Sequence, residues 1–190
     1  MTYPILIYGH PVLRKVATDI DKDYPNLQQL IDDLFETMYK SEGVGLAAPQ
    51  IGKSIRIFVI DGAPLSDDVP EMAGFKKAFI NAHITEQTGD PETMSEGCLS
   101  IPNLREEVNR EAHIRIQYYD PDWTFHDEEY KGYIARVIQH EYDHLDGILF
   151  TDRVSPLRKR LIRGKLNAIS KGKFEADYRT VLPGQKVRSL

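Results

Sequence analysis

The sequence contains the pentapeptide His140-Glu141-Tyr142-Asp143-His144, which places two histidines and a glutamate at helical spacing. Histidines four positions apart project from one side of a helix, so both rings can bind one metal ion. Glu141 would lie beside the ion, where its carboxylate can take a proton from a water molecule held there. The pentapeptide therefore predicts a catalytic metal site on a helix. The alternative is an exposed histidine pair beside a salt-bridging glutamate.

A catalytic metal site usually has three protein ligands, and the sequence restricts where the third one can lie. Metalloproteases with the longer H-E-x-x-H-x-x-G-x-x-H pattern have a third histidine at the end of that pattern. This chain has Phe150 there, and phenylalanine cannot bind a metal. Cys98 is the single cysteine, and its thiolate is a strong ligand for soft or borderline ions. A free cysteine by itself is more often a small buried residue, but with the histidine pair we interpret Cys98 as the third ligand.

A third segment, GVGLAAPQ at residues 43–50, consists mainly of glycines and other small residues. The glycines let another backbone approach closely, and the small side chains cannot fill space. The segment is therefore suited to one wall of a binding site. The alternative is a plain turn after a helix, with Gln50 exposed.

Together these segments resemble the motifs of a known enzyme family. GVGLAAPQ at 43–50, EGCLS at 96–100 and QHEYDH at 139–144 are similar to the three motifs of peptide deformylases, in the same order. The similarity extends from about Tyr8 to Phe150. It implies a metal-dependent hydrolase that removes the formyl group from the N-terminal formyl-methionine of newly synthesised polypeptides. The alternatives are a metallopeptidase or other metal-dependent amidase that uses the same helix, and a metal-binding module without catalysis.

The resemblance also implies a role for each motif residue. The metal ligands would be Cys98, His140 and His144. Glu141 would be the general acid and base, while the side-chain amide of Gln50 and the backbone N–H of Leu99 would stabilise the oxyanion. Gly45 would lie along the substrate backbone. The ligand types alone suit zinc, iron, cobalt or nickel. The resemblance implies Fe(II) as the native ion, with zinc, nickel or cobalt in some preparations.

Apolar side chains beside the metal-binding pair predict how methionine is bound. Tyr133, Val137 and His140 fall at helical spacing, so they share one face. We expect Tyr133 and Val137, together with Val44, to line an apolar pocket for the first side chain of the substrate. The alternative is ordinary core packing of these three residues.

Periodicity and turn residues predict the elements that position this chemistry. The expected helices cover residues 27–39, about 129–145 and 156–170. The expected strands cover residues 55–61, 77–84 and 113–119. Gly43 is expected to end the first helix in a left-handed conformation, and Ser155 to cap the start of the third.

These elements predict one α+β domain over residues 1–173. We expect mixed or antiparallel sheets around the central metal-binding helix, with an N-terminal helix and a C-terminal helix beside them. Residues 62–74 are rich in turn formers and predict a surface loop. Residues 174–190 are expected to form a poorly ordered tail.

Charge is distributed unevenly along the chain. Residues 153–173 hold eight Lys or Arg and no Asp or Glu, whereas the whole chain has a net charge of −5. The overall charge argues against a general nucleic-acid binder, and we expect no DNA partner. The basic segment predicts either a solvated helix face or a surface that docks on ribosomal RNA.

Composition also gives an expected location. The longest apolar runs, such as residues 57–60, are too short to cross a membrane, so no membrane partner is expected. The N-terminus has no basic segment that leads into an apolar stretch, and a single cysteine excludes an internal disulfide. We therefore expect a cytoplasmic protein whose substrates are formyl-methionyl nascent peptides.

Overall fold

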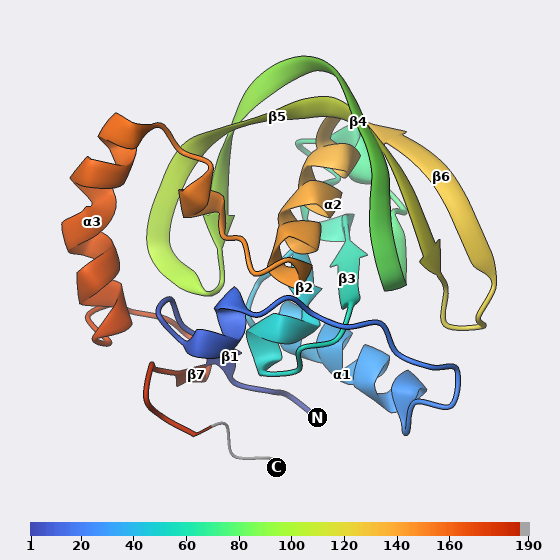
Figure 1. Ribbon diagram of the computed structural model, residues 1–190, viewed down its shortest axis with the longest axis horizontal. Coiled ribbons are helices and arrows are strands. Elements are labelled where there is room, and N and C mark those ends of the chain that lie inside the picture. The colour runs from blue at the N-terminus through green and yellow to red at the C-terminus, as the bar shows by residue number, and fades with distance from the viewer. Residues whose placement is uncertain (187–190) are drawn as a thin grey trace.

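A long antiparallel hairpin dominates the computed structural model, which describes residues 1–186. Strand β4 (Lys76–Cys98) and strand β5 (Ile101–Tyr119) form this hairpin, and both arch over helix α2 (Gly132–Leu145; Figure 1). The pairing of β4 with β5 has several register shifts, and bulges of this kind bend a strand pair. The end of β4 is thereby brought close to α2.

Three further strands extend the hairpin into a larger sheet. They are β2 (Gly45–Ala47), β3 (Ile57–Asp61) and β6 (Phe125–Lys131). The strand order is β2-β3-β4-β5-β6, and every neighbouring pair is antiparallel. All residues of β3 are buried, which explains its continuous apolar run. A separate parallel pair joins β1 (Ile5–Leu6) to β7 (Thr180–Val181).

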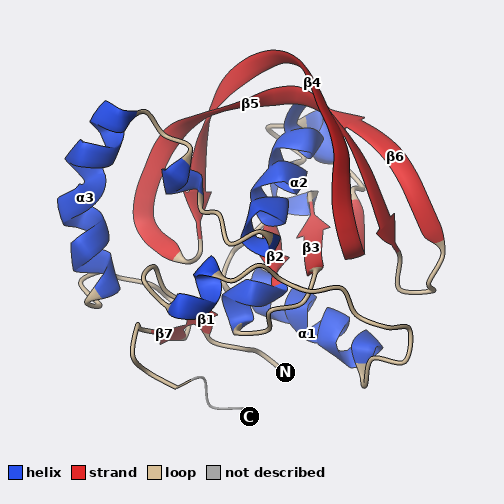
Figure 2. Ribbon diagram, in the orientation of Figure 1, coloured by secondary structure: helices blue, strands red, loops and turns tan. Residues whose placement is uncertain are grey.

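The helices differ in how much of their surface is buried. Helix α1 (Leu27–Lys40) packs its periodic apolar face into a core that includes residues of β3. Helix α2 lies inside the arch of strands and is buried on several sides, whereas helix α3 (Pro156–Ser170) lies outside it (Figure 2). The buried residues of α3 form one narrow face and are Ile162, Leu166 and Ile169. The expected α+β class, with α2 at its centre, is confirmed.

The helix ends confirm one expectation and correct another. The Oγ of Ser155 accepts a hydrogen bond from the backbone N–H of Arg158 at 3.3 Å and so caps α3. After α1, however, Glu42 rather than Gly43 takes the left-handed conformation, with a φ of 56°. Gly43 is closely packed instead: a Cβ there would lie 2.9 Å from Cδ1 of Leu99, so the leucine side chain would have to shift.

The boundaries of α2, β4 and β5 also differ from the expected ones. Residues 125–131 form β6, so α2 begins at Gly132 rather than at about residue 129. Strands β4 and β5 continue well beyond residues 77–84 and 113–119. The added part of β4 is mostly exposed, so its polar sequence lacks the apolar alternation that identifies a half-buried strand.

The expected loop at residues 62–74 contains two short 3₁₀ turns, Ala63–Leu65 and Pro70–Met72. The side chain of Met72 is fully buried and anchors this segment in the core. The neighbouring Glu71 accepts a hydrogen bond from the backbone N–H of Tyr133 at 2.6 Å. A carboxylate at that position favours the N-terminal end of α2, where backbone N–H groups lack helical partners.

The expectation of a poorly ordered tail is wrong for residues 174–186. Strand β7 pairs with β1, and the backbone N–H of Ile5 donates to the carbonyl of Arg179 at 2.8 Å. Val181 is buried. This order depends on a partner strand at the opposite end of the chain, which local periodicity cannot reveal. The last part of the expected tail, residues 187–190, lies outside the described residues.

Within residues 1–186, no helix is both long enough and apolar enough to cross a membrane.

Candidate active site

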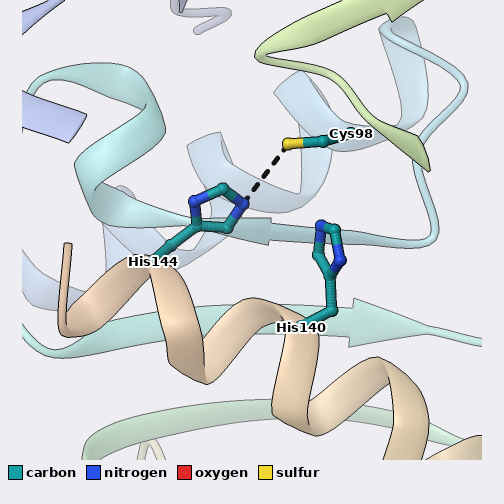
Figure 3. A group of neighbouring side chains, drawn as sticks. All are labelled: Cys98, His140 and His144. Atoms are coloured by element: carbon teal, nitrogen blue, oxygen red, sulfur yellow. Dashed lines mark hydrogen bonds between the residues drawn. The ribbon is translucent and has the colours of Figure 1, made fainter. Parts of the chain in front are cut away.

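Helix α2 and the end of β4 bring together the three predicted metal ligands. His140 and His144 project from one side of α2, and Cys98 faces them from β4 (Figure 3). The sulfur and one ring nitrogen from each histidine all lie within 4.8 Å of one another. The Sγ of Cys98 lies 3.4 Å from Nε2 of His144. One thiolate and two imidazoles in this arrangement fit a divalent transition-metal ion.

The electrostatics of the two histidines also fit a cation at this point. Burial, reinforced by the neighbouring His140, lowers the pKa of His144 well below its ordinary value, so that its ring is neutral, which is the form that binds a metal. For His140, burial opposes the charged form, but Cys98 and Glu96 outweigh it and raise the pKa. The anions around His140 therefore favour a positive charge, which a metal ion would supply.

A buried ionic network holds the His140 ring at its Nδ1 nitrogen. This nitrogen lies 2.9 Å from Oε2 of Glu96. Arg110 donates two hydrogen bonds to this carboxylate, at 2.7 and 2.9 Å, and Arg136 donates another at 3.0 Å. Arg110 also donates to Asp143 at 2.7 Å. With Nδ1 occupied in this way, the Nε2 of His140 is the nitrogen left to bind a metal.

The network keeps Glu96 ionised although this carboxylate lies inside the protein. Burial alone would raise the pKa of Glu96, but hydrogen bonds from Arg110 and His140 outweigh it and hold the pKa well below its usual range. Asp143 accepts further hydrogen bonds from Arg153, both at 2.6 Å. These partners were missed at the level of sequence. The sequence signal that could have found them was Asp143, because an acid on the buried side of the predicted helix requires a cationic partner.

Glu141 lies next to the triad and is almost completely buried. Among the described residues its Oε2 finds no hydrogen-bond partner, and burial raises its pKa to about 7. The carboxylate packs directly against Gly45, where any Cβ would overlap it. A carboxylate with this pKa can both accept and release a proton near neutral pH.

Gln50 presents an amide donor to the same place. It lies in a short 3₁₀ helix, Ala48–Ile51, and its Oε1 accepts a hydrogen bond from the backbone N–H of Ala47 at 2.9 Å. The opposite end of the amide, Nε2, is 3.2 Å from Oγ of Ser100 and 3.5 Å from Sγ of Cys98. Because the oxygen is held by the backbone, the N–H₂ group must face the metal ligands.

A pocket of about 550 Å³ opens onto this site. The predicted residues that line it are Val44, Gly45, Gln50, Leu99, Tyr133, Val137, His140 and Glu141, together with the ligand Cys98. His144 lies deeper and is only 1% exposed. Residues 175–178 form another part of the wall. They follow the expected end of the domain, and no motif or periodicity pointed to them.

Known proteins resemble this chain over most of its length. The family model described as polypeptide deformylase matches residues 2–160. The peptide deformylase of Christiangramia forsetii is 52% identical over 193 residues, with 98% of each chain covered. That of Flavobacterium johnsoniae is 53% identical over 186 residues, covering 94% of this chain and 95% of the relative. The crystal structure of peptide deformylase from Thermotoga maritima aligns with a TM-score of 0.74 at 42% identity, covering 82% of this chain and 99% of the other.

These matches cover the three motifs and agree with the triad of Cys98, His140 and His144. They favour a peptide deformylase over a metallopeptidase or a non-catalytic metal-binding module. The chain belongs to the polypeptide deformylase family and is a metal-dependent hydrolase that removes N-terminal formyl groups.

Proposed function

We propose that this chain deformylates formyl-methionyl nascent peptides with Glu141, Gln50 and Leu99 as its catalytic residues. One observation carries the assignment. A buried carboxylate with an unpartnered oxygen and an oriented amide donor lie beside the triad, on the wall of one pocket. Hydrolysis of an amide requires a proton acceptor and an oxyanion donor at such a place.

Cys98, His140 and His144 would hold the metal ion. When bound, the ion would supply Lewis acidity, which lowers the pKa of a water molecule and stabilises negative charge on the formyl oxygen. We propose Fe(II) as the native ion, with zinc, nickel or cobalt in some preparations. The support is the donor set, which suits all four ions, together with the family.

Glu141 would carry the proton. Its free oxygen takes a proton from the attacking water and later delivers it to the nitrogen of the leaving amine. The net result is the addition of water across the C–N bond of the formamide, which releases formate and a peptide with a free N-terminus. Burial raises the pKa of this carboxyl above its ordinary value, which makes the carboxylate a better proton acceptor.

Gln50 and Leu99 would stabilise the charge that builds on the formyl oxygen. The Gln50 Nε2 group is oriented before substrate arrives, because the other end of its amide is bonded to Ala47. Leu99 would donate its backbone N–H from the turn that follows Cys98. Loss of one such donor typically raises the barrier by about 3 kcal/mol.

The pocket would select methionine. Val44, Tyr133 and Val137 all line it, and we propose that they surround the first side chain of the substrate. Gly45 would let the substrate backbone pass close to Glu141. A charged group at Val137 would oppose burial of the methionine side chain, so Val137→Asp should raise KM for formyl-methionyl peptides. An unchanged KM in a folded Val137→Asp protein would reject this pocket.

A direct test uses the wild-type chain with two substrates under anaerobic conditions. Protein loaded with Fe(II) or Ni(II) is given formyl-Met-Ala-Ser and, separately, acetyl-Met-Ala-Ser. We expect formate from the first and no cleavage of any amide in the second. Cleavage of the acetylated peptide at an internal bond would instead indicate a peptidase, and absence of both reactions from metal-loaded protein would overturn the proposal.

We further propose that the basic residues of α3 dock on ribosomal RNA, which places the enzyme in the cytoplasm where its substrates are made. Arg160 and Arg163 are exposed, and Leu157 and Leu161 on the same helix are 66% and 63% exposed. Removing the whole helix would uncover its buried face, so a charge reversal is the better test. Arg160→Glu with Arg163→Glu should reduce co-sedimentation with ribosomes, with a strong salt dependence in the wild type. Lys15→Glu with Lys22→Glu changes the net charge equally and is the control; equal pelleting of all three proteins would reject docking.

A further inference from the structure

The turn between β4 and β5 is held by both ends of the chain. Strand β4 ends at Cys98 and β5 begins at Ile101, so Leu99 and Ser100 form the turn between them. The carbonyl of Ser100 accepts a hydrogen bond from the backbone N–H of Tyr8 at 2.8 Å. The carbonyl of Leu99 accepts one from the hydroxyl of Tyr178 at 2.7 Å. These two donors satisfy carbonyls that belong to neither strand ladder.

The two donors reach the turn because β1 and β7 pair with each other (Figure 1). Tyr8 lies shortly after β1, and Tyr178 lies shortly before β7. The parallel pairing is secured by the Ile5 N–H donating to the carbonyl of Arg179, at 2.8 Å. We call residues 174–181 the C-terminal strap, because they cross from α3 past the turn to β1.

The strap also forms part of the pocket wall. Glu175, Ala176, Asp177 and Tyr178 line the same pocket as the triad. The ring of Tyr178 packs against the core cluster that also receives the side chain of Leu99. The hydroxyl of Tyr178 therefore contacts Leu99, the residue that follows Cys98, and the two side chains pack against the same core cluster.

We propose that Tyr178 is a positioning residue for Leu99, an inference that rests on the proposed function. The hydroxyl of Tyr178 holds the Leu99 carbonyl, and the N–H that would bind the oxyanion belongs to the same residue. The two groups lie in adjacent peptide units joined at the Cα of Leu99, so fixing the carbonyl limits the backbone rotations that would re-aim the N–H. Donors that are held before the reaction stabilise a developing oxyanion without reorganising. The matched family model ends at residue 160, so this function would come from a segment beyond it.

The test replaces Tyr178 by phenylalanine, which keeps the ring and removes only the hydroxyl. Tyr39→Phe is the matched control, because its hydroxyl donates to Asp61 at 2.5 Å and Tyr39 does not line the pocket. For each protein, kcat and KM for formyl-Met-Ala-Ser are measured per mole of bound Ni(II), well below the temperature of unfolding. Metal content and thermal stability are measured in parallel.

We expect Tyr178→Phe to lower kcat about tenfold, with KM changed by less than about twofold and metal content unchanged. Tyr39→Phe should keep the wild-type kcat. A merely structural role for Tyr178 would lower thermal stability and leave kcat per bound metal unchanged, and that result would overturn the inference. Failure of the wild-type protein to release formate would instead reject the proposed function, so the two failures are distinguishable.

Discussion

Helices α2 and α3 both carry many charged residues, but their charges have opposite surroundings. On α2, Arg136, Glu141 and Asp143 are each about 5% exposed or less. On α3, Arg160 and Arg163 face solvent, and only a narrow apolar face is buried. A buried charge must be compensated by nearby groups, whereas an exposed one is screened by water and ions. The charges of α2 therefore contribute to stability and chemistry, whereas the exposed Arg160 and Arg163 of α3 are accessible to a partner.

The largest expected effect comes from breaking the buried network at its centre. Arg110→Met would leave Glu96 and Asp143 without their shared cation, and the free energy of unfolding should fall by about 3–5 kcal/mol. Denaturant unfolding of the purified proteins measures this change. Arg160→Met, the same substitution on α3, should stay within about 0.5 kcal/mol of the wild type. A loss below about 1 kcal/mol for Arg110→Met would contradict the contrast between the buried charges of α2 with their partners and the exposed arginines of α3.

A second prediction concerns the contact between Gly45 and Glu141. Gly45→Ala would push the Glu141 carboxylate out of place, so the rate of formate release should fall about 100-fold. The matched control is Gly164→Ala on α3, where nothing lies within 4 Å of an added Cβ. That variant should keep the wild-type rate and gain about 0.5–1 kcal/mol of stability. Equal rates for the two variants would show that Glu141 tolerates displacement.

A third prediction separates metal affinity from chemistry. Glu96→Gln would weaken the hydrogen bond at Nδ1 of His140. The affinity for Ni(II) should therefore fall about 10- to 100-fold, the loss typical when a hydrogen-bond partner of a metal-binding histidine is replaced. Competition with a chelator measures the affinity. Glu107→Gln, an exposed change on β5, serves as the control and should bind Ni(II) like the wild type. Unchanged affinity for Ni(II) in the Glu96→Gln protein would show that the buried network does not support metal binding.

The smallest expected effect is pH-dependent and concerns the anchoring of α3. The hydrogen bonds from Arg158 lower the pKa of Glu106, so this carboxylate stabilises the fold above the ordinary glutamate pKa of about 4.3. That contribution is lost as the pH falls through the lowered value. Glu106→Gln should therefore be less stable than the wild type at neutral pH, by at most about 1 kcal/mol, and the difference should disappear in strong acid. A difference that grows on acidification would have the wrong sign.

Sequence reasoning succeeded where the information is local. Apolar spacing identified α1, and Ser155 marked the start of α3. The spacing of His140 and His144 identified the metal-binding face of α2. Gln50, although it lies on a different element, was found through the resemblance of its motif. Each of these signals is contained within a short segment of chain.

The missed partners of the site and the missed order of the tail depend on residues far apart in sequence. Arg110 is an ordinary polar residue of a strand until β4 and α2 enclose it with Glu96 and Asp143. The strap is ordered because it pairs with β1, at the opposite end of the chain. No local pattern distinguishes such residues from exposed ones, because their environment is created only by the folded topology.

In the proposed mechanism, Glu141 carries the proton while Cys98, His140 and His144 hold the metal ion. This mechanism is tested most directly by measuring bound metal and formate release from formyl-Met-Ala-Ser for the wild type and Glu141→Gln. The variant keeps the shape of the side chain and loses its basicity. We predict equal metal content and a kcat lower by about 1000-fold. A Glu141→Gln protein that retains its metal and releases formate at the wild-type rate would contradict the account.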